Sequence, residues 1–324
     1  MPTTGVLLLG FGGPDSLDAV QPFMCNLMDR EPSDMLVESV CRRYLAIGGA
    51  SPLPGIAASI AAGLETRLAD SGTPVPVRVG MRYWHPFIED SFAELVELGC
   101  GRIITVSLSP FESKAASGAY REAIAAVAAH HPDLEIIEAP LVSELDAFID
   151  YMAGSTAVSI EDVEPNEGAI VVFTAHSLPE ADLEADDPYV TGLQNTAQLI
   201  AEKLGMSPGT PGAGASMFKE FTAYGSVAAP RAWFLVYQSK GQRPGAWLEP
   251  DLEALIDAAA DSDVRALVVV PIGFLTDHME TLYDLDIVAA DCALTAGVEW
   301  MRAPVINDAD VVLDAIAESI GKLL

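Results

Sequence analysis

The stretch from Val264 to Asp291, VRALVVVPIGFLTDHMETLYDLDIVAAD, determines the fold class that we expect for the whole chain. Its first part, Ala266 to Ile272, is an apolar and mostly β-branched run that ends in a Pro-Ile-Gly sequence. A run without polar alternation predicts a strand buried on both faces, in the middle of a parallel sheet. Open α/β sheets bind ligands just beyond the carboxyl ends of their strands, so the polar residues that follow are site candidates.

The second part of the same stretch predicts a helix with an acidic face. Thr276 and Asp277 are residue types that cap the start of a helix. In a regular helix Glu280 and Asp284 share a face because they are four positions apart, and Asp291 returns to that face. The alternative interpretation is a solvated helix start, because acidic residues favour the first turn through the helix dipole.

A second stretch, AIVVFTAHSLPE from Ala169 to Glu180, repeats this pattern. An apolar strand is followed directly by His176 and Ser177, and then by Leu-Pro. Two strand ends that carry a histidine and a glutamate favour a functional site over two unrelated surface turns.

Length and composition indicate two globular domains. The chain has 324 residues, of which 50% are hydrophobic, enough for two packed cores. We find no run of about 18 apolar residues and no basic, signal-like amino terminus, so the protein is expected to be soluble and cytoplasmic, without a transmembrane segment. The four cysteines are far apart and form no CxxC pair, which favours reduced thiols over a zinc site or disulfides.

The charge balance disfavours polyanionic partners. Lys and Arg number 17 against 47 Asp and Glu, a formal net charge of −30, which opposes binding to nucleic acid or to an anionic membrane. We interpret the acidity as an adaptation for solubility or high salt that is spread over the surface. The few cations, such as Arg42, Arg43 and Arg82, are therefore candidates for holding an anionic ligand.

Strand and helix patterns alternate along both halves of the chain. The first half opens with an apolar strand from Gly5 to about Phe11, followed by helical patterns at about 16–28, 34–47 and 55–70 and then by alternating strands and helices. The second half repeats the plan, which predicts an α/β fold with mostly parallel sheets. Residues 205–231, rich in Gly, Ala, Ser and Pro, are expected to form a mobile loop with an apolar anchor at Phe218 and Phe221.

These segments resemble the ferrochelatases, which insert ferrous iron into a porphyrin. The resemblance covers nearly the whole chain and is carried by LLLGFGGPDSLDAVQPFMCNLM, YLAIGGASPL, VVFTAHSLPE, WFLVYQSKGQRPGAWLEPDL and VPIGFLTDHMETLYDLDI. It implies two Rossmann-like, chelatase-type domains with parallel sheets flanked by helices and a cleft between them. The domains expected from it are 1–150 and 151–305, with a terminal helix over 306–324 that packs back on the first domain.

The resemblance also implies a catalytic pair. His176 matches the family's catalytic histidine, and a neutral imidazole can ligate iron or accept a pyrrole proton near pH 7. Glu280 matches the metal-site glutamate, which can hold iron opposite the histidine or pass the proton onward. A histidine that merely caps the loop is the alternative for His176.

Further residues match positions that contact the tetrapyrrole in relatives that use coproporphyrin. These implied porphyrin-binding residues are Phe11, Arg43, Tyr44, Ser51 and Tyr120, and the acidic helix contributes Asp284 and Asp291. For Tyr44 and Tyr120 the alternative is an amphipathic core residue.

Three positions depart from the pattern of the family. Phe11 replaces a tyrosine that ligates the product iron in some members, Met28 replaces an arginine, and Val288 replaces an acidic residue. Some relatives carry an iron–sulfur cluster on cysteines near the carboxyl terminus. Here no cysteine follows Cys292, so we expect no cluster and no cofactor beyond the substrate Fe²⁺.

The expected function is ferrochelatase activity in haem synthesis. Coproporphyrin III is favoured over protoporphyrin IX because VGMRYWHPFIEDSF and the Ser113–Tyr120 stretch look like monoderm bacterial members. A cobalt or nickel chelatase of another tetrapyrrole, and a haem-binding carrier without turnover, are the alternatives. The expected partners are the porphyrin and ferrous iron, with transient contact to neighbouring enzymes of haem synthesis.

Overall fold

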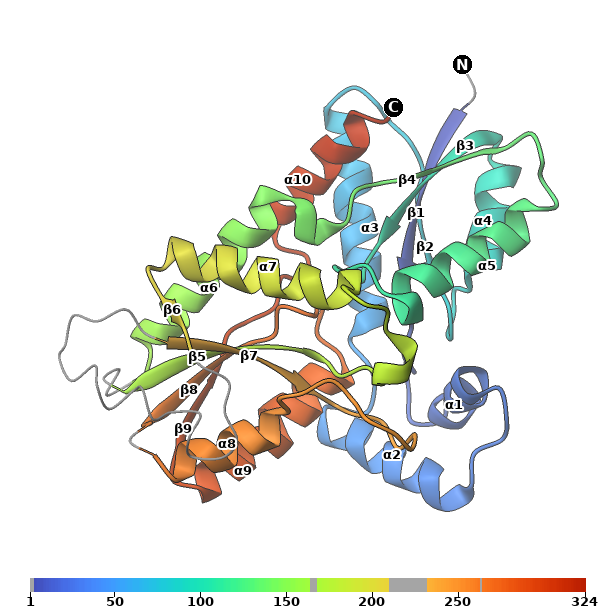
Figure 1. The fold of residues 1–324 in the computed structure, drawn as a ribbon. Helices are drawn as coiled ribbons and strands as arrows, with labels where there is room; N and C mark the ends of the chain where they lie inside the picture. The colour runs from blue at the N-terminus through green and yellow to red at the C-terminus, as the bar shows by residue number, and fades with distance from the viewer. Residues whose placement is uncertain (1–2, 164–167, 210–231, 263) are drawn as a thin grey trace. The chain divides into compact units, whose positions relative to one another are not determined.

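The chain forms two α/β units, each built on its own parallel sheet (Figure 1). The computed structural model describes residues 3–163, 168–209, 232–262 and 264–324. Unit 1 consists of 1–148, 275–279 and 306–324, and unit 2 consists of 149–274 and 280–305. The predicted fold class, parallel sheets flanked by helices, is confirmed in both units.

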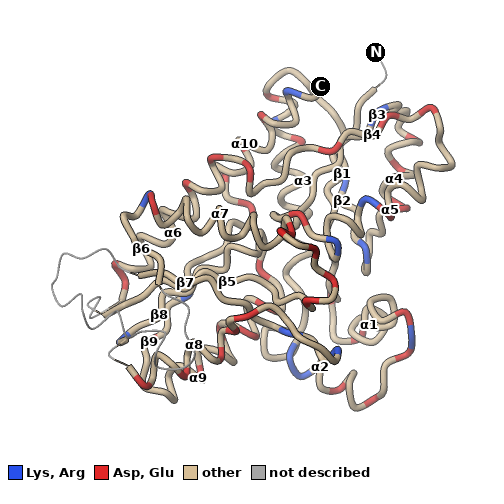
Figure 2. The backbone as a smooth tube through the Cα atoms, viewed as in Figure 1, with Lys and Arg blue, Asp and Glu red and all other residues tan. Residues whose placement is uncertain are grey.

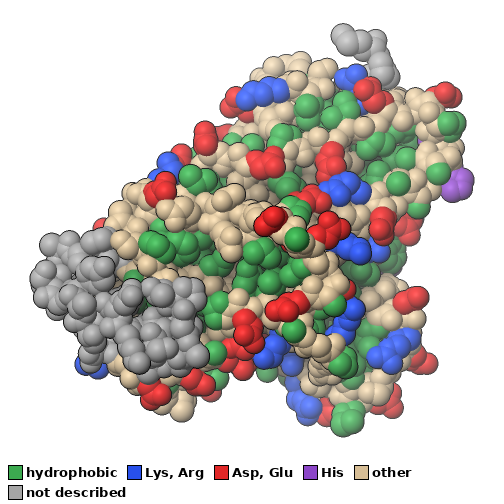
Figure 3. All heavy atoms as spheres, viewed as in Figure 1, with side chains coloured by type: hydrophobic (Ala, Val, Ile, Leu, Met, Phe, Trp, Pro, Cys, Tyr) green, Lys and Arg blue, Asp and Glu red, His purple; other side chains and the backbone are tan. Residues whose placement is uncertain are grey.

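Acidic residues occur in both units (Figure 2). On the face shown in Figure 3 their side chains are scattered among apolar and polar groups and do not gather in one patch. Several of the few cations are bound to two carboxylates: Arg67 to Asp310 and Asp314, for example. Within the described ranges no helix is both long and apolar enough to cross a membrane.

The sheet of unit 1 has the strand order β2-β1-β3-β4, with every pair parallel. Its central strand β1 is buried from Thr4 to Gly10, as an apolar run between two neighbouring strands requires. The strands of this sheet are β1 (Thr3–Gly10), β2 (Val77–Met81), β3 (Cys100–Ser107) and β4 (Glu135–Glu138).

Helices cover both faces of this sheet. Leu7 and Leu9 of β1 pack with residues of α4 and α5, including Phe92 and Ile124, in one core cluster. Helix α3 contacts β1 and β2 and is itself packed by α10. The helices of unit 1 are α1 (Val20–Met28), α2 (Asp34–Ala46), α3 (Leu53–Asp70), α4 (Ile88–Glu97), α5 (Ala119–Ala128), which follows a π-helix (Lys114–Gly118), and α10 (Asp310–Gly321).

The sheet of unit 2 has the order β6-β7-β5-β8-β9, again all parallel. Strand β5 is central, and its last residue, His176, pairs with Gln238 at the end of β7. Both residues therefore lie at the carboxyl edge of the sheet. The strands are β5 (Ala169–His176), β6 (Ser207–Pro208), β7 (Ala232–Gln238), β8 (Ala266–Val270) and β9 (Glu299–Arg302).

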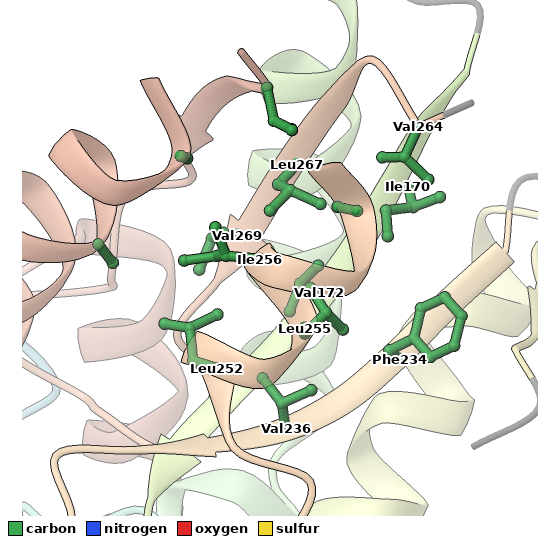
Figure 4. Packing of buried hydrophobic residues seen from close by; sticks show 14 of the residues in the cluster. Ile170, Val172, Phe234, Val236, Leu252, Leu255, Ile256, Val264, Leu267 and Val269 are labelled. Atoms are coloured by element: carbon green, nitrogen blue, oxygen red, sulfur yellow. The ribbon is translucent and has the colours of Figure 1, made fainter. Parts of the chain in front are cut away.

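One face of this sheet packs on α8 (Figure 4). Leu252, Leu255 and Ile256 of this helix belong to the same buried cluster as Val172 and Val236. The alternate residues of β5 point to the opposite face, because side chains alternate along a strand. The helices of unit 2 are α6 (Asp146–Glu161, begun in unit 1), α7 (Pro188–Lys203), α8 (Leu252–Ala260), a π-helix (Glu280–Ala289) and α9 (Ala290–Thr295); short 3₁₀ turns occur at Val142–Glu144 in unit 1 and Glu180–Asp182 in unit 2.

The structure corrects three predictions made from sequence. The acidic helix is not a regular α-helix, because Glu280–Ala289 has π-helical, i→i+5 geometry. Helix α1 begins at Val20 rather than near residue 16, since Pro22 lacks an N–H and suits the first turn of a helix. Within 205–231, predicted as a loop, Ser207–Pro208 forms the edge strand β6, while Phe218 and Phe221 lie outside the described residues.

Candidate active site

His176 and Glu280 form a hydrogen-bonded pair in unit 2, although 104 positions separate them in the sequence. His176 is the last residue of β5, and Glu280 begins the π-helix Glu280–Ala289. Nδ1 of the histidine lies 3.0 Å from Oε2 of the glutamate, and the two side chains are 34% and 32% exposed. The structure thus brings together the two residues predicted to be catalytic, and leaves both accessible to a ligand.

The hydrogen bond to Glu280 determines which ring nitrogen of His176 carries the proton. An ionised Glu280 accepts a hydrogen bond, so Nδ1 of His176 carries the proton and Nε2 of the neutral ring carries the lone pair. Burial lowers the pKa of His176, but the charge of Glu280, its hydrogen bond and the charge of Asp284 together outweigh burial and raise this pKa above 6.5. The ring can therefore accept a proton on Nε2 and hold it as an imidazolium paired with Glu280.

The backbone around His176 is held at two points. The hydroxyl of Tyr189 donates a 2.8 Å hydrogen bond to the carbonyl oxygen of His176. Burial, followed by the charge of Glu280, raises the pKa of Tyr189 well above 10, which keeps this hydroxyl protonated. The next residue, Ser177, donates its N–H to the carbonyl of Gln238 and its hydroxyl to the carbonyl of Leu248.

The π-helix is held by the end of β7. The side-chain amide of Gln238 donates to the carbonyl of Glu280 at 3.0 Å, and the hydroxyl of Ser239 donates to Asp284 at 2.5 Å. Ser239 has a φ of 57°, a left-handed conformation that is uncommon for residues other than glycine. Tyr189, Gln238 and Ser239 are site residues that were not predicted from sequence. The available signal was the Gln238-Ser239 pair at the end of β7, which repeats the His176-Ser177 pair at the end of β5.

The two other acids of this region lie differently. Asp291 is an exposed residue of α9, and no hydrogen bond within the described residues joins it to the pair. Asp286 receives a two-pronged hydrogen bond from Arg302, at 2.5 and 2.9 Å. The structure therefore places Asp284 where its charge acts on His176, and gives Asp286 a separate ion pair.

The His176–Glu280 pair offers few ligands for a metal ion. Within the part of the chain that the structure describes, no three or more His, Cys, Asp or Glu side chains are grouped to hold a metal ion. One imidazole nitrogen and one carboxylate are fewer ligands than the four of structural zinc sites. Such a pair can contribute ligands to a divalent ion and can accept protons.

Phe11 lies on the surface of unit 1. The residue is 38% exposed, and its ring packs edge-on against Tyr83, with ring centroids 4.8 Å apart. The guanidinium of Arg82 donates to the hydroxyl of Tyr83 at 3.0 Å and to the carbonyl of Ala119 at 2.8 Å. With this exposure Phe11 is not part of the buried core of unit 1.

The remaining predicted porphyrin contacts of unit 1 differ in exposure. Arg43 is exposed on α2, whereas Tyr44 is 5% exposed in a cluster with Trp84. Ser51 is 8% exposed, and its N–H donates to the carbonyl of Pro14 at 2.7 Å. Tyr120 is 2% exposed, and burial raises its pKa to about 12. Tyr44 and Tyr120 are thus placed as core residues, the alternative that their amphipathic side chains left open.

The sequence is similar to ferrochelatases along its full length. The family model described as Ferrochelatase matches residues 3–323. A ferrochelatase of Synechococcus elongatus is 31% identical over 346 residues, covering 100% of this chain and 83% of that protein. One from Geotalea uraniireducens is 31% identical over 343 residues, covering 98% of this chain and 97% of that protein.

Two solved structures with a similar fold are SirB and CbiX. SirB from Bacillus subtilis, solved with Fe³⁺, has a TM-score of 0.59 at 15% identity and covers 99% of this chain and 95% of that one. CbiX, described as the terminal enzyme for biosynthesis of sirohaem in denitrifying bacteria, has a TM-score of 0.54 at 15% identity and covers 99% of both chains. At this identity the likeness shows a shared chelatase-type fold.

Proposed function

The chain belongs to the ferrochelatase family, and on that premise we propose that it inserts Fe²⁺ into a porphyrin, with coproporphyrin III as the preferred substrate. The family implies a lyase that inserts metal into a tetrapyrrole. The observation that carries the proposal within this chain is the His176–Glu280 pair, 3.0 Å apart at the carboxyl edge of a parallel sheet. Ligand groups of open α/β folds lie at this edge.

The His176–Glu280 pair can accept the protons that metal insertion releases. Insertion exchanges two pyrrole N–H protons for one Fe²⁺ and leaves the oxidation state of iron unchanged. Nε2 of His176 accepts one proton, and the resulting imidazolium is stabilised by Glu280 and by the nearby charge of Asp284. After release of that proton to solvent, the same nitrogen is free to accept the second.

The preference for coproporphyrin III is supported by sequence. The stretches VGMRYWHPFIEDSF and Ser113–Tyr120 resemble members that use this substrate. Coproporphyrin carries four propionates, two more than protoporphyrin, and needs more hydrogen-bond donors to hold them. Arg43 is exposed on α2 and can donate two parallel hydrogen bonds to a carboxylate.

An insertion assay with two porphyrins tests the proposal. Purified protein is mixed anaerobically with Fe²⁺ and with coproporphyrin III or protoporphyrin IX, and haem formation is followed by absorbance. We expect a higher kcat/KM for coproporphyrin III. Binding of both porphyrins without insertion would support a haem carrier instead, and faster insertion of Co²⁺ or Ni²⁺ into a less oxidised tetrapyrrole would support the other chelatase class.

We propose that the reaction needs no resident cofactor. The four cysteines are far apart in the sequence and form no CxxC pair; Cys100 is buried and Cys292 is exposed. Iron and sulfide analysis of the purified protein should find no stoichiometric cluster. A cluster that is lost together with activity would contradict this part of the proposal.

A further inference from the structure

Gln238 is the residue that connects the two halves of the His176–Glu280 pair. Its backbone carbonyl accepts the N–H of Ser177, the neighbour of His176, at 2.8 Å. Its side-chain amide donates to the backbone carbonyl of Glu280 at 3.0 Å. One residue at the end of β7 thus contacts the histidine loop on one side and the glutamate itself on the other.

The side-chain amide of Gln238 is buried, which limits the hydrogen bonds that it can form. The residue is 6% exposed, and Nε2 lies between the carbonyl of Glu280 and the hydroxyl of Ser239, which is 3.4 Å away. Its Oε1 is buried and accepts no hydrogen bond within the described residues. An unsatisfied buried acceptor disfavours folding, so an apolar residue of the same length would suit this position better if stability alone mattered.

The hydrogen bond from Gln238 is made at the first residue of the π-helix. Glu280 is the first residue of the π-helix Glu280–Ala289, whose i→i+5 geometry is rare and frequent at functional sites. Holding the carbonyl of Glu280 fixes the position of its Cα, and with it the direction from which the carboxylate approaches Nδ1 of His176. Ser239 adds a second hold, four residues further on, at Asp284.

We propose that Gln238 is a positioning residue for metal insertion, which sets the approach of Glu280 to His176 through the backbone of Glu280. The inference rests on the proposed function and deepens it. Gln238 contacts neither porphyrin nor iron in this role. Its loss therefore lowers the rate of insertion while it leaves porphyrin binding in place.

The matched experiment compares Gln238→Met with Gln198→Met. Methionine has the length of glutamine and removes both the donor and the unsatisfied Oε1. Gln198 is an exposed residue of α7 that donates to Glu202 at 2.7 Å, so its variant controls for the loss of a glutamine hydrogen bond far from the pair. We expect Gln238→Met to lower kcat at least about tenfold with an unchanged KM for porphyrin, and Gln198→Met to match wild type.

A double-mutant cycle separates positioning from a general loss of structure. If Gln238 acts through Glu280, then Gln238→Met introduced into Glu280→Gln adds little further loss of kcat. Additive losses would overturn the inference, because they would mean that Gln238 acts independently of the carboxylate. Gln238→Asn, whose amide is one methylene too short to reach, is expected to behave like Gln238→Met and serves if the methionine variant does not fold.

The outcomes distinguish the inference from its premise. If wild type inserts no metal into any porphyrin, the proposed function fails. If wild type is active and Gln238→Met retains its kcat, the proposed function stands and the positioning role of Gln238 fails.

Discussion

At His176 the two ring nitrogens have different surroundings. Nδ1 is bonded to Glu280 and Nε2 is left for chemistry, so the orientation of the ring follows from one hydrogen bond. The backbone of His176 is fixed by Tyr189, a hydroxyl whose raised pKa keeps it a donor. The imidazole is therefore positioned before any ligand arrives, which reduces the reorganisation needed during proton transfer.

Replacing the imidazole should stop the reaction and spare binding. We expect His176→Ala to abolish insertion and to leave porphyrin affinity within about tenfold, or roughly 1.4 kcal/mol. Burial of the macrocycle and contacts to its propionates supply the affinity, whereas the ring acts on protons and metal. Fluorescence titration with porphyrin and the insertion assay measure the two effects, and substantial residual turnover would remove His176 from the mechanism.

The pH dependence of insertion should report the pKa of His176. Only the neutral ring accepts a proton, so activity rises as pH increases through this pKa. Because Glu280 and Asp284 raise it despite burial, the midpoint of kcat/KM should lie above 6.5. Asp284→Asn removes one of the raising charges and should move the midpoint to lower pH; a midpoint that does not move would show that another group controls the profile.

Phe11 should determine what ligates the product. A phenyl ring has no lone pair for iron, so ferric product haem is expected to show no phenolate bands in its resonance Raman spectrum. Phe11 is 38% exposed, so Phe11→Tyr places a hydroxyl where a ligand can meet it and should introduce these bands. Phenolate bands in wild type would point to Tyr83, which touches Phe11, rather than to the buried Tyr120.

The π-helical geometry of Glu280–Ala289 changes where the acidic residues lie around the helix axis. Regular helix geometry predicts Glu280, Asp284 and Asp291 on one face, but i→i+5 bonding puts more residues in each turn and alters their bearings. Asp284 still lies near the pair, while Asp291 is exposed on α9 beyond the wide turns. A hydrophobic pattern cannot reveal this, because nothing in residue spacing distinguishes ten π-helical residues from an amphipathic α-helix.

Variants of this helix should rank by their distance from the pair. Insertion should slow most in Glu280→Gln, less in Asp284→Asn and least in Asp286→Asn. Asp286 accepts two hydrogen bonds from Arg302, whose side chain is 13% exposed. Asp286→Asn should therefore lower the free energy of unfolding by about 1 kcal/mol instead of slowing insertion. Insertion rates and urea unfolding test both statements, and equal rates in all three variants would show that only total negative charge counts.

Much of the fold and the central pair could be predicted from sequence. Buried parallel strands are apolar along their whole length, so β5 and β8 stand out, and the residues that follow them mark the site edge. The supporting residues Tyr189, Gln238 and Ser239 could not be identified as such, because their roles depend on contacts with backbone atoms far away in sequence. The burial of Tyr44 and Tyr120 likewise depends on packing that an amphipathic side chain leaves open.

Net charge is a property of the whole molecule. With a formal charge of −30, the folded chain repels itself, and the acids are scattered and not confined to one site (Figures 2 and 3). Raising ionic strength from about 0.1 M to 1 M shortens the Debye length from about 10 Å to 3 Å. We therefore expect the Tm to rise with NaCl, and to rise equally with choline chloride; a rise with NaCl alone would indicate specific sodium sites instead of screening.

The division of the chain between its units has a consequence for synthesis on the ribosome. Unit 1 begins with the first residues but also includes 275–279 and α10, whose Asp310 and Asp314 are bound by Arg67 of α3. Domains commonly fold as units during translation, the N-terminal one first. Helix α3 is not covered by α10 until residues 306–324 have been made. A nascent chain stalled before residue 306 should therefore hold an unfinished first unit, with the face of α3 that α10 covers exposed to chaperones.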